Sequence, residues 1–306
     1  MTGQHYSVGE FALLQRPEKS PLGYHYALAS CSVYSDYRRS EKVSYTVREF
    51  LQGFYPAACC TASRGLQVTY CLGIKVDDGI VMISDSRTSA GVDNISTYSK
   101  MWKFGVPGER QFVLCSAGNL ATTQAVTAML ERDAKDSAAQ SLLSVRDMHE
   151  AAEYIGRINV ESQNQNTGGG AMFETTFLLA GEIKGAGNGL MMIYPAGNFI
   201  ASSSQVPFLQ IGETKYGKPI LDRVIKSDTS PERAALCGLV SMEATIRSNL
   251  TVGPPVEIYL LDAGALQPGR YLFFDEQDNY LRDLRNSWNQ LMQESFDKLQ
   301  PLTFPD

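Results

Sequence analysis

TYCLGIKVDDGIVMISDSR, which runs from Thr69 to Arg87, decides the fold of this chain. The runs TYCLGIKV and IVMISDSR are rich in β-branched and apolar residues, and the tight turn DDG lies between them. Two such runs joined by a short turn containing Gly predict a β-hairpin. We therefore expect the folded domain to open with a hairpin whose first residue is Thr69.

The sequence after this hairpin continues as a polar loop, strands, two helices, strands, two helices, strands and a last amphipathic helix. The expected strands are Lys100 to Phe104, Gln111 to Ala117, Thr175 to Glu182, Leu190 to Tyr194, Asn198 to Ala201, Pro207 to Ile211, Val256 to Leu261 and Tyr271 to Phe274. The expected helices are Leu120 to Asp133, Val145 to Asn166, Tyr216 to Lys226, Pro231 to Ile246 and Asp278 to Leu299. This order favours an α+β fold, a four-layer αββα sandwich formed by residues 69–306 as one domain.

Residues 1–68 differ from the rest of the chain in composition. They hold seven of the 15 tyrosines and three of the six cysteines, and they show no sustained apolar period of either 2 or 3.6 residues. We expect a poorly ordered N-terminal extension, either a mis-assigned start of translation or a propeptide.

Charge and composition exclude several classes of function. Residues 69–306 carry 20 Lys and Arg against 28 Asp and Glu, so no basic field attracts nucleic acid or anionic lipid. The sequence has neither a run of about 18 apolar residues nor a basic start followed by an apolar run, which favours a cytoplasmic location and no membrane partner. His149 is the only histidine after residue 68, which argues against a Ser-His-Asp triad or a His-rich zinc site. The cysteines after residue 68 lack CxxC spacing and are expected to be small buried apolar groups.

Thr69 alone indicates only a β-branched residue opening an edge strand. Polar motifs that follow it change this interpretation: SDSRTSAG at 84–91, the tripeptide ending in Lys100, and SAGN at 116–119. Asp85 lies 16 residues and Lys100 lies 31 residues after Thr69.

With these motifs in place, residues 69–306 resemble the proteasome β-subunit family, and most closely its bacterial Anbu relatives. The segments IGETKYGKPILDR (211–223) and MEATIRSNLTVGPPVEIYLLD (242–262) resemble Anbu segments specifically. The resemblance implies an N-terminal-nucleophile hydrolase that cleaves a peptide or another amide, with Thr69, Asp85 and Lys100 in its active site. It also implies self-assembly into a ring or spiral.

The chemistry of these residues supports that assignment. A threonine hydroxyl needs a base, and a free α-amine on Thr69, with a pKa near 8, would be held within reach by covalent geometry. The ammonium of Lys100 would lower the pKa values of both groups, and Asp85 would compensate this buried charge. No cofactor or metal is expected, because the chain supplies every group.

Lys103 is the rival for the lysine position. Regular strand alternation would place residues 100 and 103 on opposite faces, so only one of them can point toward Thr69. We prefer Lys100 on the family spacing, although many proteasome subunits place the lysine one residue later, at Met101 here.

The resemblance also implies supporting groups. The N–H of Gly118, at a strand-to-helix turn, would face the developing oxyanion, although a plain helix-start glycine is the alternative. Family members hold the N-terminal amine with an Asp-x-x-Ser pair, and this chain has Ser248 and Thr251 in that region. The altered pair keeps two other functions open, a non-peptide amidase and an assembly protein with a silent site.

A free amine on Thr69 requires a chain that starts there. Family members cleave a propeptide after a glycine, but Val68 precedes Thr69 here. Valine is also how an internal GTG start codon is read in an overlong frame, and we prefer this second route.

A phosphate-binding loop at residues 212–219 is excluded. These residues fit the motif only as far as GxxxxGK, because Pro219 has neither the hydroxyl nor the N–H that the motif needs.

Overall fold

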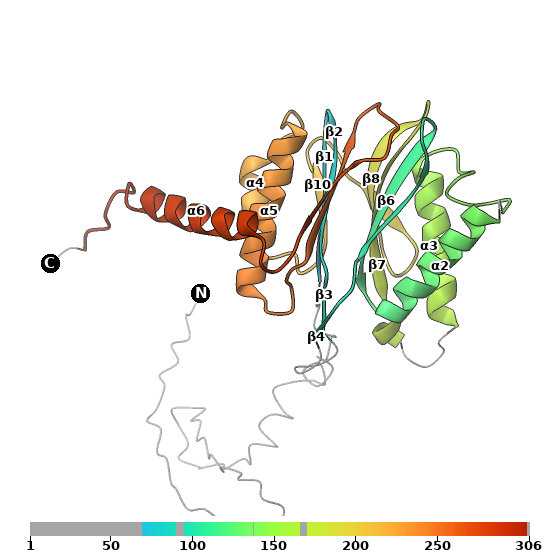
Figure 1. The fold of residues 1–306 in the computed structure, drawn as a ribbon, viewed down its shortest axis with the longest axis horizontal. Helices are drawn as coiled ribbons and strands as arrows, with labels where there is room; N and C mark the ends of the chain where they lie inside the picture. The colour runs from blue at the N-terminus through green and yellow to red at the C-terminus, as the bar shows by residue number, and fades with distance from the viewer. Residues whose placement is uncertain (1–68, 90–94, 137, 166–169, 305–306) are drawn as a thin grey trace, which may run out of the picture. The chain divides into compact units, whose positions relative to one another are not determined.

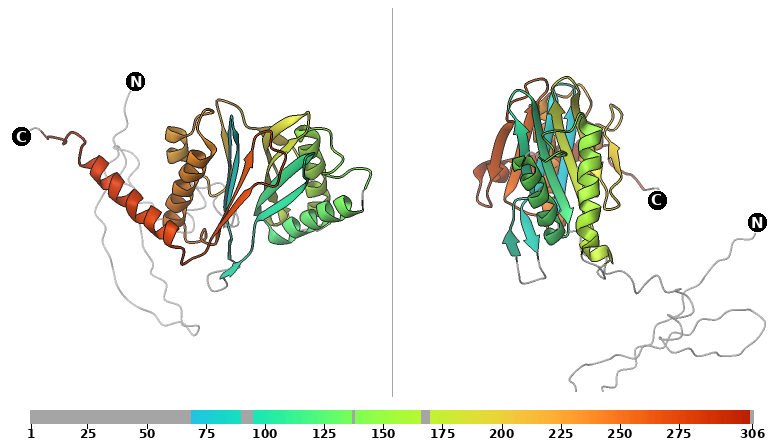
Figure 2. Two further views of the ribbon diagram at one scale, coloured as in Figure 1. Left: turned by 45° about the horizontal axis from the view of Figure 1, so that its top comes forward. Right: turned by 90° about the vertical axis from the view of Figure 1, so that its right-hand side faces the viewer.

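Two five-stranded antiparallel sheets lie face to face in the computed structural model, and a pair of helices covers the outer face of each (Figure 1). The structure describes residues 69–89, 95–136, 138–165 and 170–304, all within one unit that spans Gly65–Asp306. Two further views show the same four layers (Figure 2). The expected αββα sandwich is therefore confirmed.

The first sheet has the strand order β10-β1-β2-β11-β12. Its strands are β1 (Tyr70–Val76), β2 (Gly79–Asp85), β10 (Phe208–Gly212), β11 (Val256–Asp262) and β12 (Arg270–Phe274). Its outer face is covered by α4 (Lys218–Val224) and α5 (Pro231–Ser248).

The second sheet has the order β5-β6-β7-β8-β9. Its strands are β5 (Met101–Val106), β6 (Arg110–Gly118), β7 (Thr175–Ile183), β8 (Gly187–Ile193) and β9 (Phe199–Ala201). Its outer face is covered by α2 (Leu120–Lys135) and α3 (Met148–Asn164), and the short 3₁₀ helix η1 (Gly170–Phe173) precedes β7.

Three apolar layers hold the sandwich together, and strand alternation assigns residues to them. Along β1, Leu72 and Ile74 point into the first core layer, which lies between this sheet and helices α4 and α5. Cys71 points to the opposite side, into the central layer between the two sheets. Along β7, Leu179 packs below α2 and α3, whereas Leu178 enters the central layer. Successive side chains of a strand face opposite sides, so one strand serves two layers. Cys71, like the other two cysteines of the described chain, is buried and unpaired, as expected.

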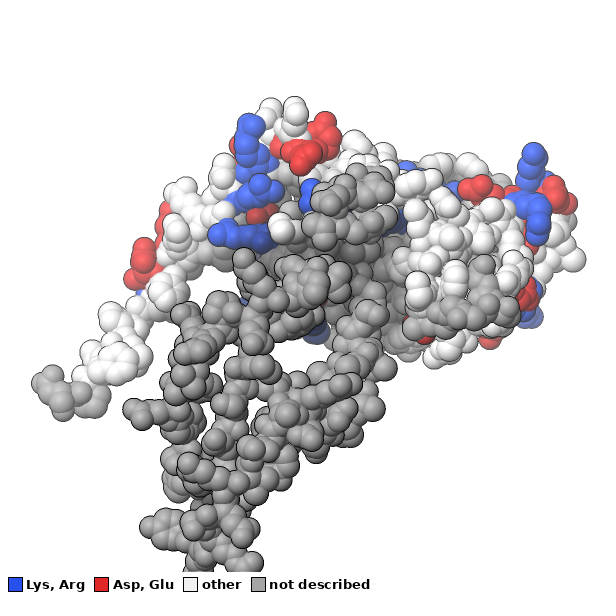
Figure 3. All heavy atoms as spheres, turned by 90° about the horizontal axis from the view of Figure 1, so that it is seen from below, with Lys and Arg blue, Asp and Glu red and all other residues white. Residues whose placement is uncertain are grey.

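The C-terminal helix α6 (Asn279–Phe296) begins against α5 and then extends away from it (Figures 1 and 2). Leu281 and Leu284 pack against the first core layer, but no residue of α6 is buried. None of the described helices is long and apolar enough to cross a bilayer. On the face shown in Figure 3, basic and acidic side chains of the described residues lie in mixed groups.

Three local features differ from the sequence-based expectation. The polar loop after Arg87 contains a two-stranded ribbon of β3 (Arg87–Ser89) and β4 (Ile95–Thr97), whose three-residue strands are too short to show a period. The α3 helix starts three residues late because the Asp147 side chain caps it by accepting from the N–H of Glu150. The α4 helix is shorter than expected, because Pro219 occupies its first turn and Ile225 is extended.

Candidate active site

Pairing of β1 with β2 places Asp85 beside the start of the domain. Cys71 lies opposite Ser84, so Asp85 at the end of β2 reaches the backbone of Tyr70. Its Oδ1 atom accepts from the N–H of Tyr70 at 3.0 Å, and its Oδ2 atom accepts from the N–H of Gly253 at 3.2 Å. Asp85 is fully buried and Thr69 is 5% exposed. The carboxylate therefore lies under the first residue of the strand.

Lys100 and not Lys103 contacts Asp85. The Nζ atom of Lys100 donates to Oδ1 of Asp85 at 2.8 Å and to the carbonyl of Arg87 at 2.6 Å. The Nζ atom of Lys103 lies 3.5 Å from the ring centroid of Tyr271. The two lysines thus point to different surroundings, as strand alternation predicts.

Burial raises the pKa of Asp85, because a low-dielectric environment disfavours the carboxylate. The charge and hydrogen bond of Lys100, and then the N–H groups of Tyr70 and Gly253, act in the opposite direction. Each of these donors stabilises the charged form. Oδ1 of Asp85 accepts from the Lys100 ammonium while both carboxylate oxygens accept from backbone N–H groups, so the carboxylate holds that ammonium in a fixed position.

A small pocket, here called the Thr69 pocket, collects three of the predicted site residues. Its lining residues are Thr69, Thr88, Lys100, Ser116, Gly118, Leu120 and Thr123. They come from the start of β1, from β3, from the end of β6 and from the first turn of α2, with Lys100 just before β5. The β5–β6 hairpin brings Lys100 close to Gly118, since the N–H of Ser116 donates to the carbonyl of Lys100. Thr69 precedes β1 of the other sheet, so the packing of the two sheets brings it to them.

Position 118 requires a glycine, both for its backbone conformation and for the close approach of the neighbouring chain. Its φ is +126°, and an added Cβ would lie 2.3 Å from the carbonyl oxygen of Glu174. A side chain would therefore collide with the adjacent loop. Asn119 then caps α2 by accepting from the N–H of Thr122. The turn that was predicted for this position is present, and Gly118 lines the Thr69 pocket.

Ser248 is not brought to this pocket. It is the last residue of α5 and is exposed. The next residue, Asn249, points toward the site instead: its Nδ2 atom donates to Oε2 of Glu213 at 3.3 Å, and its Oδ1 atom accepts from the hydroxyl of Thr251 at 2.6 Å. The N–H of Glu213 donates to the carbonyl of Thr69 at 2.8 Å.

Glu213 contacts Thr69 and Asn249 contacts Glu213, and sequence reasoning gave neither residue a role. The short polar stretch around Glu213 was the only signal, and its partner on Thr69 depends on the register between β1 and β10. Tyr70 lies opposite Gly212 in that pairing. Gly212 has a φ of +80°, and an added Cβ would lie 1.9 Å from the carbonyl oxygen of Thr69. The glycine of the excluded phosphate-loop match therefore allows the backbone of Thr69 to approach closely.

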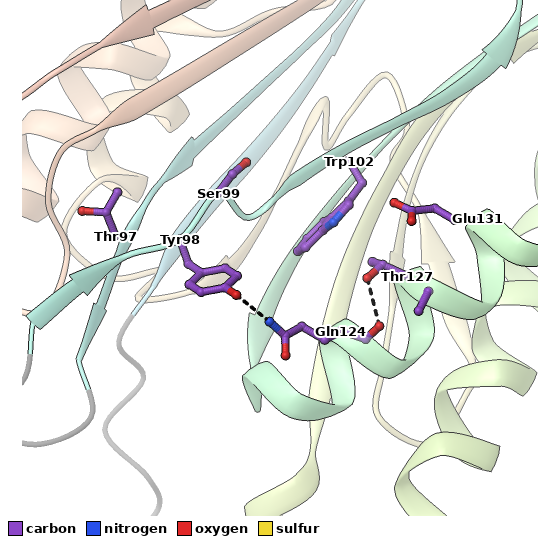
Figure 4. A pocket seen from close by; sticks show the side chains of 8 residues that line it. Thr97, Tyr98, Ser99, Trp102, Gln124, Thr127 and Glu131 are labelled. Carbon is purple, nitrogen blue, oxygen red and sulfur yellow. Dashed lines mark hydrogen bonds between the residues drawn. The ribbon is translucent and has the colours of Figure 1, made fainter.

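A larger open groove of about 480 Å³ lies beside α2, and we call it the α2 groove (Figure 4). It is lined by Thr97, Tyr98, Ser99, Trp102, Gln124, Thr127, Ala128 and Glu131. The amide Nε2 of Gln124 donates to the hydroxyl of Tyr98 at 2.9 Å, which links the helix to the strand side. Ser99 lines this groove, whereas Lys103 lines neither site.

Arg87 and His149 do not line the Thr69 pocket. The Nη1 atom of Arg87 donates to the carbonyl of Leu250 at 2.9 Å, and its Nη2 atom lies 4.0 Å from Oε1 of the exposed Glu276. His149 meets the ring of Phe199 edge to face at 5.9 Å. Among the described residues, no group of three or more His, Cys, Asp and Glu is placed to hold a metal ion.

Comparison with known proteins gives one consistent result. A family model described as "Proteasome subunit" matches residues 67–261. A solved structure described as "Anbu (ancestral beta-subunit) from Yersinia bercovieri" is 41% identical, with a TM-score of 0.75, and the match covers 78% of this chain and 100% of that chain. The comparison with curated proteins gave no significant match.

Two further solved structures are similar to a comparable extent. "Helical Assembly of the Anbu Complex from Pseudomonas aeruginosa" is 39% identical, with a TM-score of 0.74 and coverage of 77% of this chain and 98% of that chain. "Anbu from Hyphomicrobium sp. strain MC1" is 38% identical, with a TM-score of 0.72 and coverage of 77% and 100%.

Proposed function

Because the chain belongs to the Anbu proteins of the proteasome family, we propose that it is an amide or peptide hydrolase whose nucleophile is the hydroxyl of Thr69. One observation carries the proposal: Thr69, Lys100 and Gly118 line one pocket, and Lys100 is held there by the buried carboxylate of Asp85. This arrangement supports acyl transfer once Thr69 carries a free α-amine as the base.

In the proposed reaction, the α-amine of Thr69 takes the proton of its own hydroxyl, and the oxygen attacks the substrate carbonyl. The ammonium of Lys100 stabilises the alkoxide that forms. The N–H of Gly118 stabilises the negative oxygen of the tetrahedral intermediate. The amine proton passes to the departing nitrogen, which leaves an ester on Thr69, and water then releases the acyl group as a carboxylic acid.

This chemistry requires Thr69 to be the first residue of the active chain. In the sequence as written its nitrogen forms an amide with Val68, and an amide cannot act as the base. The match to the family model starts at residue 67, close to the proposed start. We propose that the active form begins at Thr69, and we favour a translation start at residue 68 over cleavage of a propeptide.

Intact-mass analysis of protein made from the natural gene, with its own upstream sequence, tests that start. A chain of residues 69–306 with no trace of the preceding peptide supports the internal start. Detection of residues 1–68, attached or released, would show that they are translated.

An electrophilic β-lactone or peptide epoxyketone tests the nucleophile. The reagent should add its mass to the wild-type chain at Thr69, should still label Thr69→Ser, and should leave Thr69→Ala unlabelled. A correctly processed wild-type chain that resists labelling would contradict the hydrolase and favour an assembly protein with a silent site.

Self-assembly is the second part of the proposal. The solved relative from Pseudomonas aeruginosa is described as a helical assembly, and we propose that this chain also associates with copies of itself. Light scattering on the processed protein measures this directly, and a monodisperse monomer at micromolar concentration would contradict it.

A further inference from the structure

The α2 groove and the Thr69 pocket are adjacent along a single helix face. Leu120 and Thr123 line the pocket, and Gln124, Thr127 and Glu131 line the groove. These positions recur every three or four residues, which places them on one side of α2. On the strand side, Lys100 lines the pocket and the preceding Ser99 lines the groove.

Glu131 in the groove lies within the length of a short substrate segment from the Thr69 pocket. An α-helix rises about 1.5 Å per residue, so Thr123 and Glu131 are separated by about 12 Å along α2. An extended chain covers that distance in about four residues at roughly 3.3 Å each. A substrate held at Thr69 can therefore place in the groove either a long side chain at the cleaved bond or a residue within about four positions of it.

Among the described residues that line the groove, Glu131 alone is charged. Its neighbour Arg132 lies 3.6 Å from Asp133 instead, and no ion pair of Glu131 with another described residue is within 4.0 Å. The other lining groups are hydroxyls, an amide, a methyl group and the rings of Tyr98 and Trp102. Figure 4 shows Trp102 on the strand side of the groove and Glu131 on the helix side.

This combination selects one class of ligand. A carboxylate attracts an ammonium or guanidinium group, and an indole ring adds a cation–π interaction with the same group. Tyr98 is 44% exposed and gives a second ring beside which an aliphatic stem can lie. An acidic side chain would be repelled by Glu131.

We infer that the α2 groove binds a lysine or arginine side chain of the substrate close to the cleaved bond, and that Glu131 determines this specificity. The inference rests on the proposed hydrolase function and names its substrate class.

The test uses protein expressed from the natural gene, with an N-terminus at Thr69 verified by intact mass. The protein is incubated with a library of synthetic peptides of defined sequence, and the cut sites are read by mass spectrometry. Lys and Arg should be enriched about fivefold at one position within about four residues of the cut, the size expected for an exposed charge pair. The enrichment should disappear in Glu131→Gln.

Asp136→Asn is the matched control, because it removes the same charge from an exposed residue at the end of α2 that does not line the groove. It should keep the wild-type preference. Labelling of Thr69 by a β-lactone is measured on the same samples. Labelled, active protein without Lys or Arg enrichment, or with enrichment that survives Glu131→Gln, would overturn the inference and leave the hydrolase intact. Absence of both labelling and cleavage would overturn the proposed function and this inference with it.

Discussion

The ammonium of Lys100 lies 2.8 Å from Oδ1 of Asp85, and the two side chains are only 7% and 0% exposed. Every other ion pair between described residues includes a side chain that is at least 46% exposed, as in the pair of Arg285 and Glu243. Burying two charges costs free energy that their attraction offsets only partly. A single enclosed pair beside Thr69 therefore indicates a functional arrangement more than a stabilising one.

Lys100→Met should abolish labelling of Thr69 and lower the free energy of unfolding by about 3–5 kcal/mol, because it leaves the Asp85 carboxylate buried without a cation. Urea unfolding measures the stability, and intact mass after β-lactone treatment measures the labelling. Lys103→Met is the control, since its cation–π contact with Tyr271 is worth about 0.5–1 kcal/mol and labelling should persist.

The double variant Lys100→Met with Asp85→Asn separates these two effects. Removal of both charges should recover most of the lost stability, whereas labelling should remain absent. Recovery of labelling would show that the lysine charge is not needed at Thr69.

Gly212→Ala should displace Thr69, because the new Cβ would lie 1.9 Å from its carbonyl oxygen and the φ of +80° disfavours a side chain. We expect a loss of stability of about 2–4 kcal/mol and at least a tenfold slower labelling of Thr69. Gly108→Ala is the matched control, with a φ of +81° and no atom within 4 Å of the added Cβ. It should cost about 1 kcal/mol and leave labelling unchanged. Equal effects of the two substitutions would show that the contact with Thr69 has no consequence.

Asn249→Ala should slow labelling of Thr69 about threefold to tenfold, because it releases Glu213, whose N–H holds the carbonyl of Thr69. Ser248→Ala, at an exposed neighbouring position, should have the smaller effect of the two. The rate of mass gain with β-lactone compares them. A larger effect at Ser248 would restore the role that the family resemblance gave to it.

Stability at high pH should depend on Tyr70. Burial raises the pKa of its hydroxyl from 10.0 to about 12, with hydrogen bonds from the Ser241 and Gln210 side chains in the opposite direction. The unfolded state loses this proton at lower pH than the folded state. The stabilising contribution of the protonated Tyr70 hydroxyl is therefore complete below pH 10 and is lost as the pH rises from 10 to 12. Tyr70→Phe should lower the free energy of unfolding at pH 7 by about 1 kcal/mol, because its hydrogen bonds are lost. Between pH 10 and 12 the stability of this variant should decline less steeply than that of the wild type. Urea unfolding across this range measures both slopes, and parallel slopes would contradict the assignment.

Much of the fold follows from local sequence patterns. The hairpin from Thr69, the turn at Gly118 and the alternation along β1 and β7 all depend on neighbours within a few residues, and the structure has them where they were expected. The ribbon of β3 and β4 could not be predicted in this way, because three-residue strands carry no measurable period and form only by pairing with each other.

The sequence by itself determined the order of the layers and the spacing of Thr69, Asp85 and Lys100, because turn residues and apolar periods act locally. Only the tertiary structure decided that Lys100 reaches Asp85 while Lys103 lies over Tyr271, and that Asn249 rather than Ser248 connects to Thr69 through Glu213. These contacts join segments that are distant along the chain. They depend on the register between strands and on how the two sheets pack, which no local pattern specifies.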